Sequence, residues 1–582
     1  MDLHPFAVEY LSNPTQDVLR SLTLEHTPAV VSTVHQNLVK MSRNKARKAA
    51  FTYIIAEDTR AAEFSSQLIS PAKAQALIAA QAAYIEASGK MIEIQGFIGL
   101  GERAVATQWL YTLEGANIAA MQQILAFAQE EVLAQGEAFT PTLRVIYTPG
   151  MVVEGMPGKQ AILVDLESYT TYVMGPDYFG ESKKGALRMF TQYIYRQGGL
   201  VLHAGAKSVK IGDKLISMTI MGLSGTGKTT TTFSKQGEVT QPIQDDMVSI
   251  WPGGAMSITE NGCFAKTEGL TEDSEPVIYR GTLDPTAWVE NVYVDETGEF
   301  DFFKGALTPA EVARVRELLV ATNAPVANVD RYIAGEVTVA EVSDANGVLL
   351  DGWDFVKWTG NGRSIIPMAA IENAADLHQI PAVRSMGILN RDEGLDAATP
   401  GIVRFTSPEQ AAGYFMLGET SKTSAAGKEV GKTRSPFTQP FFPLAHGLQA
   451  TRFSELAATM PGIGLWLMNT GFVGGDAKTV KEGVGFKVKI RHSSAMLEAM
   501  LTDSVVWKVD PDFGYEVVDV AHPANAPLLA VVPAEILDPA QYFAAQGRSE
   551  AYKAWVERMR VERAAFLRKF GVDEGIVAAV CR

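Results

Sequence analysis

The chain has 582 residues, of which 47% are hydrophobic and 20% charged, and its formal net charge is −15 at pH 7. This length and composition predict a soluble globular protein of two large lobes, and the acidic balance argues against a nucleic-acid partner because phosphate backbones need a basic surface. Cys263 and Cys581 are the only cysteines, which excludes a disulfide framework and a four-cysteine zinc site.

The N-terminal sequence and the hydrophobic runs bear on location. Met1-Asp2-Leu3-His4-Pro5 lacks the basic flank and the apolar segment of a secretory signal. The sequence contains no run of about 18 apolar residues that could span a bilayer. We therefore expect a cytoplasmic protein with no membrane partner.

The first part of the chain has helical and then strand-like patterns. Residues 71–135 are rich in Ala, Gln, Glu and Leu at helical spacing, which predicts two or more helices. Residues 142–174 contain β-rich runs separated by Pro-Gly turns, which predict sheet. A helix is predicted over residues 183–197. We place a boundary just after it, between an N-terminal lobe (residues 1–199) and a C-terminal lobe (residues 200–582).

The second part begins with a hairpin pattern over residues 209–221 that runs into a glycine-rich loop. Residues 307–352 combine a charged amphipathic helix, over residues 309–321, with acidic, turn-rich sequence that carries no chemical motif. We interpret this segment as a possible insertion. Residues 541–570 have the periodicity and charge of a solvated surface helix.

The glycine-rich loop has the pattern of a phosphate-binding loop. Gly222-Leu-Ser-Gly-Thr-Gly-Lys228-Thr229 matches G-x-x-x-x-G-K-[ST] and lies between a β-rich run and a helix start. Its glycines would let backbone N–H groups approach phosphates, Lys228 would neutralise the β- and γ-phosphates, and Thr229 would offer its hydroxyl to Mg²⁺. An accidental glycine-rich turn is the alternative, which the strand context disfavours. The loop predicts a nucleoside triphosphate with a divalent metal.

Two carboxylates and a histidine are further candidates. Asp245 and Asp246 end a β-like run that begins at Val239, where a metal-binding acid would follow a phosphate-binding loop. An Asp-Asp pair by itself is more often a turn, and only its position after the loop favours a ligand. His203 follows the run of residues 200–202, and its spacing alone fits a core histidine better than a ligand.

Several motifs, taken in order, resemble the family of ATP-dependent phosphoenolpyruvate carboxykinases. The first group is Tyr178-Phe-Gly-Glu-Ser-Lys183-Lys184-Gly, Leu202-His203-Ala, the glycine-rich loop, Asp245-Asp246 and Asn261-Gly-Cys-Phe-Ala-Lys266-Thr. The second is Glu275-Pro-Val-Ile-Tyr, Gly362-Arg363-Ser-Ile-Ile-Pro and Asn469-Thr-Gly-Phe. The resemblance implies an α/β, two-lobed carboxykinase-like fold with a substrate-binding N-terminal lobe and a P-loop mononucleotide-binding C-terminal lobe. It also implies that oxaloacetate is decarboxylated and then phosphorylated by ATP, giving phosphoenolpyruvate, CO₂ and ADP.

The same resemblance assigns roles to individual residues. It implies ATP with Mg²⁺ and a second divalent metal, Mn²⁺, with the metal ligands Lys184, His203, Asp246 and Thr229. The implied catalytic residues are Lys184, Lys228, Asp245, Lys266 and Arg363. The implied substrate-binding residues are Arg43, Tyr178 and Lys183. The implied nucleotide-binding residues are Gly222, Leu223, Ser224, Gly225, Thr226, Gly227, Lys228, Thr229, Thr230, Glu275, Lys487, Val488 and Ser493.

The chain also departs from the family pattern. Met41-Ser-Arg-Asn-Lys-Ala-Arg lacks the glycine and the proline that flank the family's substrate arginine, so a solvated basic face is an equal alternative for Arg43. Asp245-Asp246-Met-Val-Ser stands for Asp-Asp-Glu-His, and Asn390-Arg-Asp392-Glu-Gly stands for Thr-Ala-Asp-Ala-Phe-Gly. These departures concern the substrate pocket and leave the phosphate and metal motifs intact.

Two other functions stay open. One is a P-loop small-molecule kinase that acts on a different acceptor, and the other is a nucleotide-binding regulatory protein with a silenced site. The cluster of Tyr178, Lys184 and His203 favours a carboxykinase over a simple kinase. The sequence leaves the oligomeric state, the direction of the reaction and the choice of ATP over another phosphoryl donor open.

Overall fold

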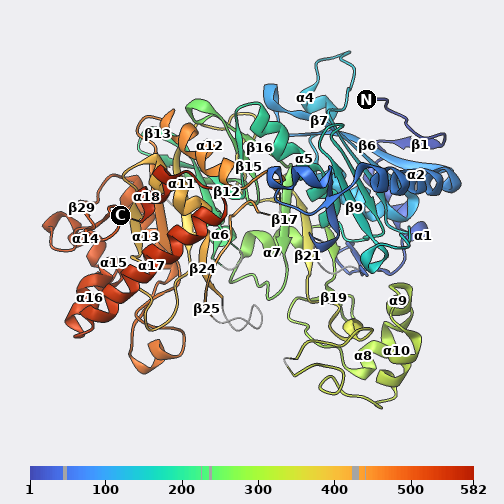
Figure 1. Cartoon of the computed structure of the whole chain (residues 1–582). Coiled ribbons are helices and arrows are strands. Elements are labelled where there is room, and N and C mark those ends of the chain that lie inside the picture. The colour runs from blue at the N-terminus through green and yellow to red at the C-terminus, as the bar shows by residue number, and fades with distance from the viewer. Residues whose placement is uncertain are drawn as a thin grey trace. The chain divides into compact units, whose positions relative to one another are not determined.

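The computed structural model describes residues 1–43, 49–223, 226–234, 239–345, 347–422, 431–439 and 441–581. The chain forms two compact units (Figure 1). Unit 1 comprises residues 1–192 and 259–372, and unit 2 comprises residues 193–258 and 373–582. Helices and sheets are mixed in both units, which confirms the predicted α/β class.

The larger sheet of unit 1 has the strand order β1-β6-β7-β8-β10-β9-β4-β5. Every residue of β7 and β8 is buried. These include polar side chains, and Arg144 Nε donates a hydrogen bond of 2.7 Å to Gln108 Oε1. The helix α2 (Pro71–Ser88) is capped by the Ser70 side chain and ends at Gly89 in the left-handed conformation. The strands are β1 (Glu9–Ser12), β4 (Thr52–Ile55), β5 (Leu68–Ile69), β6 (Lys90–Ile98), β7 (Val105–Thr112), β8 (Leu143–Thr148), β9 (Ala161–Asp165) and β10 (Thr170–Met174). The other helices of residues 1–196 are α1 (Gln16–His26), α3 (Ala116–Leu125), α4 (Gln129–Val132) and α5 (Gly180–Arg196).

A second sheet of unit 1 explains why the contact grouping differs from the division predicted at residue 199. Its order is β17-β21-β18-β3-β2, so β18 pairs in parallel with β3 from the N-terminal part of the chain. Residues 259–372 therefore group with residues 1–192 and not with the glycine-rich loop. The strands are β2 (Val30–Ser32), β3 (Leu38–Lys40), β17 (Gly262–Lys266), β18 (Trp288–Glu290) and β21 (Arg363–Pro367), and α7 (Pro276–Leu283) and the hairpin of β19 (Tyr293–Val294) with β20 (Phe300–Asp301) lie in the same segment.

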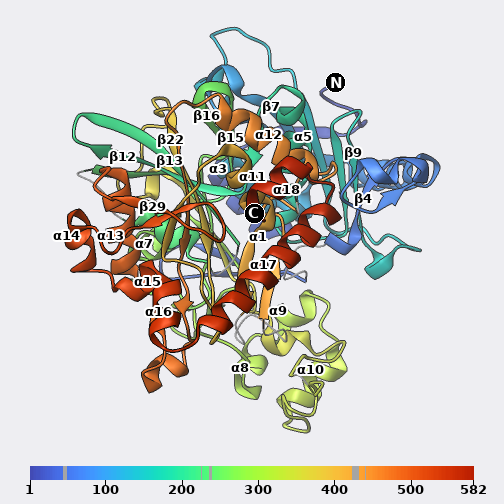
Figure 2. The same ribbon diagram turned by 60° about the vertical axis from the view of Figure 1, so that its left-hand side comes forward.

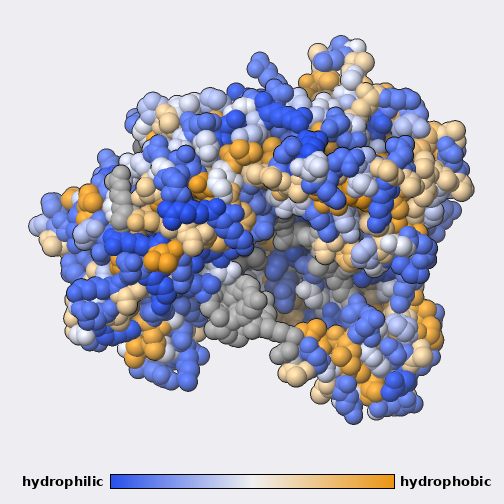
Figure 3. All heavy atoms as spheres, in the orientation of Figure 1, coloured by the Kyte–Doolittle hydropathy of each residue, from blue (hydrophilic) through white to orange (hydrophobic). Residues whose placement is uncertain are grey.

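Residues 307–358 form a helical subdomain within unit 1. It contains α8 (Pro309–Arg314), α9 (Arg316–Ala321) and α10 (Val326–Ile333). The helix predicted over residues 309–321 is thus two helices, because Val315 leaves helical geometry at φ −103° and ψ 15°. The subdomain shares one hydrophobic core with Met41 and Tyr293. Figure 3 shows hydrophobic residues on the face of the subdomain that is in view. Within the subdomain, Val326, Val348 and Leu350 are exposed.

The main sheet of unit 2 has the order β14-β12-β13-β22-β26-β23-β30-β29. Its strands β12 and β13 form the predicted hairpin. The strands are β12 (Ala204–Ile211), β13 (Lys214–Gly222), β14 (Val239–Gln244), β22 (Val383–Asn390), β23 (Ile402–Arg404), β26 (Gly464–Asn469), β29 (Trp507–Val509) and β30 (Glu516–Val518). Smaller sheets contain β11 (Leu200–Leu202) with β15 (Val248–Ile250) and β16 (Met256–Ile258), β24 (Glu419–Lys422) with β25 (Gly431–Arg434), and β27 (Phe472–Val473) with β28 (Phe486–Lys487).

The helices of unit 2 include a C-terminal group that is partly buried. The pattern over residues 541–570 corresponds to α16 and α17, and α17 buries Trp555, Met559 and Arg563, so it is not only a surface helix. Figure 2 shows α17 and α18 beside α11. The helices are α6 (Lys228–Phe233), α11 (Pro408–Leu417), α12 (Gly447–Ala458), α13 (Ile490–Leu501), α14 (Ala526–Leu529), α15 (Ala534–Leu537), α16 (Pro539–Ala545), α17 (Ser549–Lys569) and α18 (Glu574–Val580). Among the described helices of both units, none has the length and apolar composition needed to cross a bilayer.

Candidate functional site

Strand ends in unit 2 bring the predicted phosphate and metal residues to one edge of the main sheet. β13 is parallel to β22, and β22 is parallel to β26, so Gly222, Asn390 and Asn469 end neighbouring strands. β12 is antiparallel to both β13 and β14. His203, just before β12, and Asp246, just after β14, therefore reach the same edge. The carboxyl ends of parallel strands are where open α/β sheets bind ligands.

The glycine-rich loop joins β13 to α6 at this edge. A Cβ at Gly222 would lie 2.3 Å from the Thr226 hydroxyl oxygen, and Gly227 has φ +88°, so both positions require glycine. Lys228 begins α6, which also contains Thr229 and Thr230. Of the predicted loop residues, Ser224 and Gly225 lie outside the described residues, and Leu223 precedes that gap.

His203 and Asp246 form a close pair. His203 Nε2 lies 3.0 Å from Asp246 Oδ1, and the Lys228 ammonium lies 3.5 Å from the same oxygen. His203 Nδ1 lies 2.9 Å from the Phe437 carbonyl. Because a carbonyl only accepts, Nδ1 carries the proton and the Nε2 lone pair faces the carboxylate. A cation between these two acceptors would offset the repulsion between them. Histidine ligands of metals commonly donate a hydrogen bond from the ring nitrogen that does not bind the metal, as Nδ1 does here.

The electrostatic environment also suits ligation by His203. Burial, and next the charge of Lys228, lower the pKa of the imidazole below its usual value, while Asp246 opposes them. The neutral ring, which is the form that binds metals, is therefore favoured near neutral pH. The neighbouring Asp245 is buried, with 5% of its surface exposed.

A cavity of 420 Å³ adjoins the loop. Segments far apart in the sequence line it: Thr226, Gly227 and Thr230 from the loop and α6, and Lys487, Val488 and Ser493 from the predicted nucleotide segment. Thr470 joins the two sides, because its hydroxyl donates to the Thr226 carbonyl at 2.8 Å while its own carbonyl accepts from the Lys487 ammonium at 3.0 Å. The structure thus brings these predicted nucleotide residues together around one space.

Unit 1 holds a second group of predicted residues. Lys266 ends β17 and Arg363 begins β21, and the two are directly opposite in the antiparallel ladder. The Arg363 guanidinium lies over the Phe264 ring at 5.6 Å. The Tyr178 hydroxyl accepts a hydrogen bond of 3.1 Å from the Asn361 amide, and burial raises the pKa of this phenol. Lys266 and Arg363 thus share one end of the second sheet, and the Tyr178 ring lies 6.4 Å from the ring of Phe264 on β17.

The two lysines on α5 are both buried. Lys183, with 2% of its surface exposed, forms an ion pair of 2.8 Å with Glu260, which is also buried. Lys184 is 7% exposed. The Glu260 pairing gives Lys183 a structural role, and its predicted contact with substrate stays a prediction. Glu275, predicted to bind nucleotide, lies in unit 1 immediately before α7.

Arg43 is the last residue described before the gap at residues 44–48. Its backbone N–H donates to Asp177 Oδ2 at 3.0 Å, and its Nε lies 3.4 Å from the same oxygen. Its Nη2 donates to the carbonyls of Pro149 and Gly175 at 2.5 and 3.2 Å. Arg43 is therefore bound into unit 1 and is not a residue of a solvated basic helix face.

Comparison with known proteins agrees with these motifs. Residues 8–324 and 342–525 match the family model described as phosphoenolpyruvate carboxykinase. The chain belongs to this family. It is 27% identical over 420 residues to the ATP-dependent phosphoenolpyruvate carboxykinase of Thermus thermophilus and 28% identical over 414 residues to that of Afipia carboxidovorans. The alignments cover 70% and 69% of this chain but only 65% and 63% of those enzymes. The alignment with the Mesorhizobium japonicum enzyme, at 26% identity, covers 82% of this chain and 76% of the relative.

Residues 325–341 and 526–582 lie outside the carboxykinase family match. The first segment belongs to the helical subdomain of unit 1, and the second contains the helices from α14 to α18. These elements are therefore not aligned with the carboxykinase family model.

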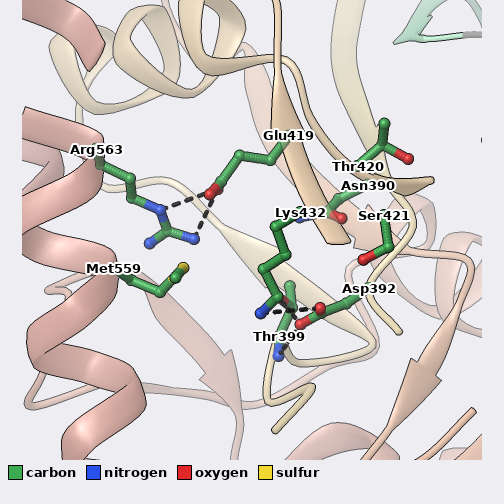
Figure 4. A pocket seen from close by; sticks show the side chains of 9 residues that line it. All are labelled: Asn390, Asp392, Thr399, Glu419, Thr420, Ser421, Lys432, Met559 and Arg563. Atoms are coloured by element: carbon green, nitrogen blue, oxygen red, sulfur yellow. Dashed lines mark hydrogen bonds and ion pairs between the residues drawn. The ribbon is translucent and has the colours of Figure 1, made fainter. Parts of the chain in front are cut away.

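The C-terminal segment outside the match contributes to a polar cluster in unit 2 (Figure 4). Arg563 from α17 forms an ion pair with Glu419 on β24, and Lys432 on β25 forms one of 3.1 Å with Asp392. The Asp392 N–H donates to the side chain of Asn469, at the carboxyl end of β26. The cluster connects a helix outside the carboxykinase match with the edge of the main sheet at which the glycine-rich loop begins.

Three residues of these groups were not singled out by sequence reasoning. Thr470 lies in the Asn469-Thr-Gly motif, which was matched to the carboxykinase family without a role for the threonine. Asn361 precedes the Gly362-Arg363 motif by one residue, so its position was a usable signal. Asp177 precedes Tyr178, but only the tertiary structure shows that it contacts Arg43.

Proposed function

We propose that this chain is an ATP-dependent phosphoenolpyruvate carboxykinase that converts oxaloacetate and ATP to phosphoenolpyruvate, CO₂ and ADP. The observation that carries the proposal is the cavity of 420 Å³ that both the loop and residues 487–493 line. The His203 and Asp246 pair, which also contacts Lys228 of the loop, supports it. The relatives in the comparison support the same function, because they are named as ATP-dependent phosphoenolpyruvate carboxykinases. Unit 2 would then be the P-loop, nucleotide-binding lobe.

In this proposal the loop binds the triphosphate. The residues Gly222 to Thr230, including Ser224 and Gly225, would surround the phosphates with backbone N–H groups, and Lys228 would neutralise the β- and γ-phosphates. Glu275, Lys487, Val488 and Ser493 would contact the nucleoside. The half-buried ammonium of Lys487, already bonded to the Thr470 carbonyl, would be held in place for this contact.

The divalent metals would be held by oxygen and nitrogen ligands. Lys184, His203 and Asp246 would bind Mn²⁺, with Lys184 as a neutral amine, and Thr229 would bind the Mg²⁺ of the nucleotide. Bound metals would supply Lewis-acid stabilisation of the enolate and phosphate oxygens. The neutral His203 imidazole and its position beside Asp246 support this ligand set.

The reaction needs positioning and charge stabilisation from the remaining residues. The bond from the substrate to its departing carboxylate would break, its electron pair would form the enolate, and the enolate oxygen would attack the γ-phosphorus as ADP leaves. Lys266 and Arg363 would stabilise the charge on the transferred phosphoryl group, with Lys228 and Asp245 beside the phosphates. Arg43 and Tyr178 would bind the carboxylate of the substrate, with Lys183 beside Tyr178.

The test is phosphoenolpyruvate formation from oxaloacetate and ATP with Mg²⁺ and Mn²⁺ present. We expect product with the native chain and a loss of at least about 100-fold in Lys228→Ala and in His203→Gln. ATP binding that depends on Lys228 without any product would refute the carboxykinase reaction and favour a kinase with another acceptor. ATP binding unaffected by Lys228→Ala would refute the phosphate site itself.

A further inference from the structure

The segment that carries Arg43 lacks the glycine and proline of the family motif, yet it is held by several side chains of unit 1. The Ser42 N–H donates to Asn291 Oδ1 at 2.9 Å, and the Ser42 hydroxyl donates to Glu290 Oε1 at 3.2 Å. Asn291 in turn donates its N–H to the Lys40 carbonyl at 2.9 Å. Residues 40–42 are thus hydrogen-bonded to the last residue of β18, Glu290, and to Asn291, which follows it.

Asp177 holds Arg43 itself. Its Oδ2 accepts from the Arg43 backbone and faces Arg43 Nε, and the Lys40 ammonium lies 3.5 Å from the same oxygen. Asp177 and Lys40 are 6% and 3% exposed. A buried carboxylate with two cations is strongly oriented, because in a low dielectric each contact is worth more than in water.

Tyr178, next in sequence to Asp177, is also held in position by hydrogen bonds. Its carbonyl accepts from the Tyr147 hydroxyl at 2.9 Å, its hydroxyl accepts from Asn361, and the following Phe179 N–H donates to Glu290 Oε1 at 3.1 Å. Glu290 therefore bonds both the Ser42 side and the Tyr178 side. The two predicted substrate residues, Arg43 and Tyr178, belong to one connected network.

We propose that Asp177 is a positioning residue that aims the Arg43 guanidinium at the substrate carboxylate and fixes its placement relative to Tyr178. The proposal rests on the proposed function of this site. Asp177 and the carbonyls of Pro149 and Gly175 occupy Nε and Nη2. In the described part of the chain, Nη1 has no hydrogen bond, so this end of the guanidinium is the one that would meet a carboxylate.

Asp177 affects substrate binding in two opposing ways. The direction in which a substitution of Asp177 changes substrate affinity therefore shows which effect is larger. Its negative charge beside Arg43 weakens the attraction of the guanidinium for a second carboxylate. Its contacts also remove rotamers that Arg43 would otherwise lose on binding substrate, which favours binding. Burial raises the pKa of Glu290 to about 8, so that carboxyl is largely protonated near neutral pH and adds little to the repulsion. The proposal holds that positioning outweighs repulsion.

The experiment compares native enzyme with Asp177→Asn, Arg43→Ala and the double variant. We expect Asp177→Asn to raise the KM for oxaloacetate on the order of tenfold, with the KM for ATP unchanged. In the Arg43→Ala background the same substitution should have no further effect, because Asp177 acts through Arg43. The matched control is Glu154→Gln, which removes an exposed carboxylate paired with Lys159 in the same unit and should leave both KM values unchanged.

Binding of oxalate, measured by calorimetry, gives a readout that needs no turnover. The proposal is supported if Asp177→Asn binds oxalate more weakly than native protein while the double variant binds it no more weakly than Arg43→Ala alone. A lower KM for oxaloacetate or tighter oxalate binding in Asp177→Asn would overturn it. The proposal would also be overturned if Asp177→Asn reduced oxalate affinity equally in the native and the Arg43→Ala backgrounds. Native protein that binds oxalate through Arg43 but forms no phosphoenolpyruvate would refute the proposed function and leave this inference standing.

Discussion

The buried pair of Arg563 and Glu419 should contribute strongly to the stability of unit 2. Arg563 is 3% exposed, and its Nη2 lies 2.8 Å from Glu419 Oε2. Arg434 holds the other oxygen of Glu419 at 2.9 Å. We choose Arg563→Met as the perturbation, because methionine keeps the helix propensity and the contacts with the Tyr414 and Phe513 rings while it removes the charge.

The magnitude follows from the pKa of Glu419. Although burial, the largest influence, raises this pKa, Arg563 and then Arg434 lower it from 4.5 to about 2. That difference corresponds to about 3 kcal/mol of stability, of which Arg563 supplies the largest electrostatic share. Because the folded pKa is depressed, the contribution is complete above pH 4.5 and is lost as the pH falls toward 2.

The assay is differential scanning calorimetry at pH 7 and at pH 3.5. We expect Arg563→Met to lower the Tm of unit 2 by about 5–10 °C at pH 7, and the gap between native and variant to narrow at pH 3.5. The control is Arg558→Met on the same helix, which breaks an exposed pair with Asp396 and should cost about 0–1 kcal/mol. Equal shifts in the two variants, or a gap that does not depend on pH, would refute the reasoning.

Three further predictions concern the glycine-rich loop, the cavity beside it and the lysine pair of α5. Gly222→Ala should weaken ATP binding at least about tenfold, because the added Cβ would lie 2.3 Å from the Thr226 hydroxyl. The control is Gly305→Ala, whose added Cβ would have no atom within 4 Å and should leave ATP affinity unchanged. Equal ATP affinities of the two variants by calorimetry would contradict this prediction. Thr470→Val removes the 2.8 Å hydrogen bond to the Thr226 carbonyl and should raise the KM for ATP by about five- to tenfold without changing that for oxaloacetate, so a change confined to oxaloacetate would exclude this role. Glu260→Gln leaves the buried Lys183 ammonium without its 2.8 Å carboxylate and should destabilise unit 1 by about 3–5 kcal/mol, and the Lys183→Met, Glu260→Gln double variant should recover most of it. Full activity in the refolded double variant would show that Lys183 does not bind substrate.

Local sequence was sufficient for the elements that depend on near neighbours. The hairpin of β12 with β13 and the helix start that follows the glycine-rich loop were predicted, because turn residues, alternation and the required glycines lie within a few residues of one another. The break at Val315 was not predicted, because the helical period of residues 309–321 continues through it. The family was also recognisable, since its motifs keep their order.

Tertiary structure decided every feature that depends on pairing between distant segments. The parallel pairing of β3 with β18 places residues 259–372 in unit 1, and no local pattern specifies a partner strand so far away. The same holds for side chains: His203 faces Asp246, Lys183 pairs with Glu260, and Arg43 is held by Asp177 only because the fold brings distant segments of the chain together. The sequence by itself determined which chemical groups this protein has and which local elements hold them. The tertiary structure decided which of these groups meet, because long-range strand register and burial are set by the whole core and not by any one segment.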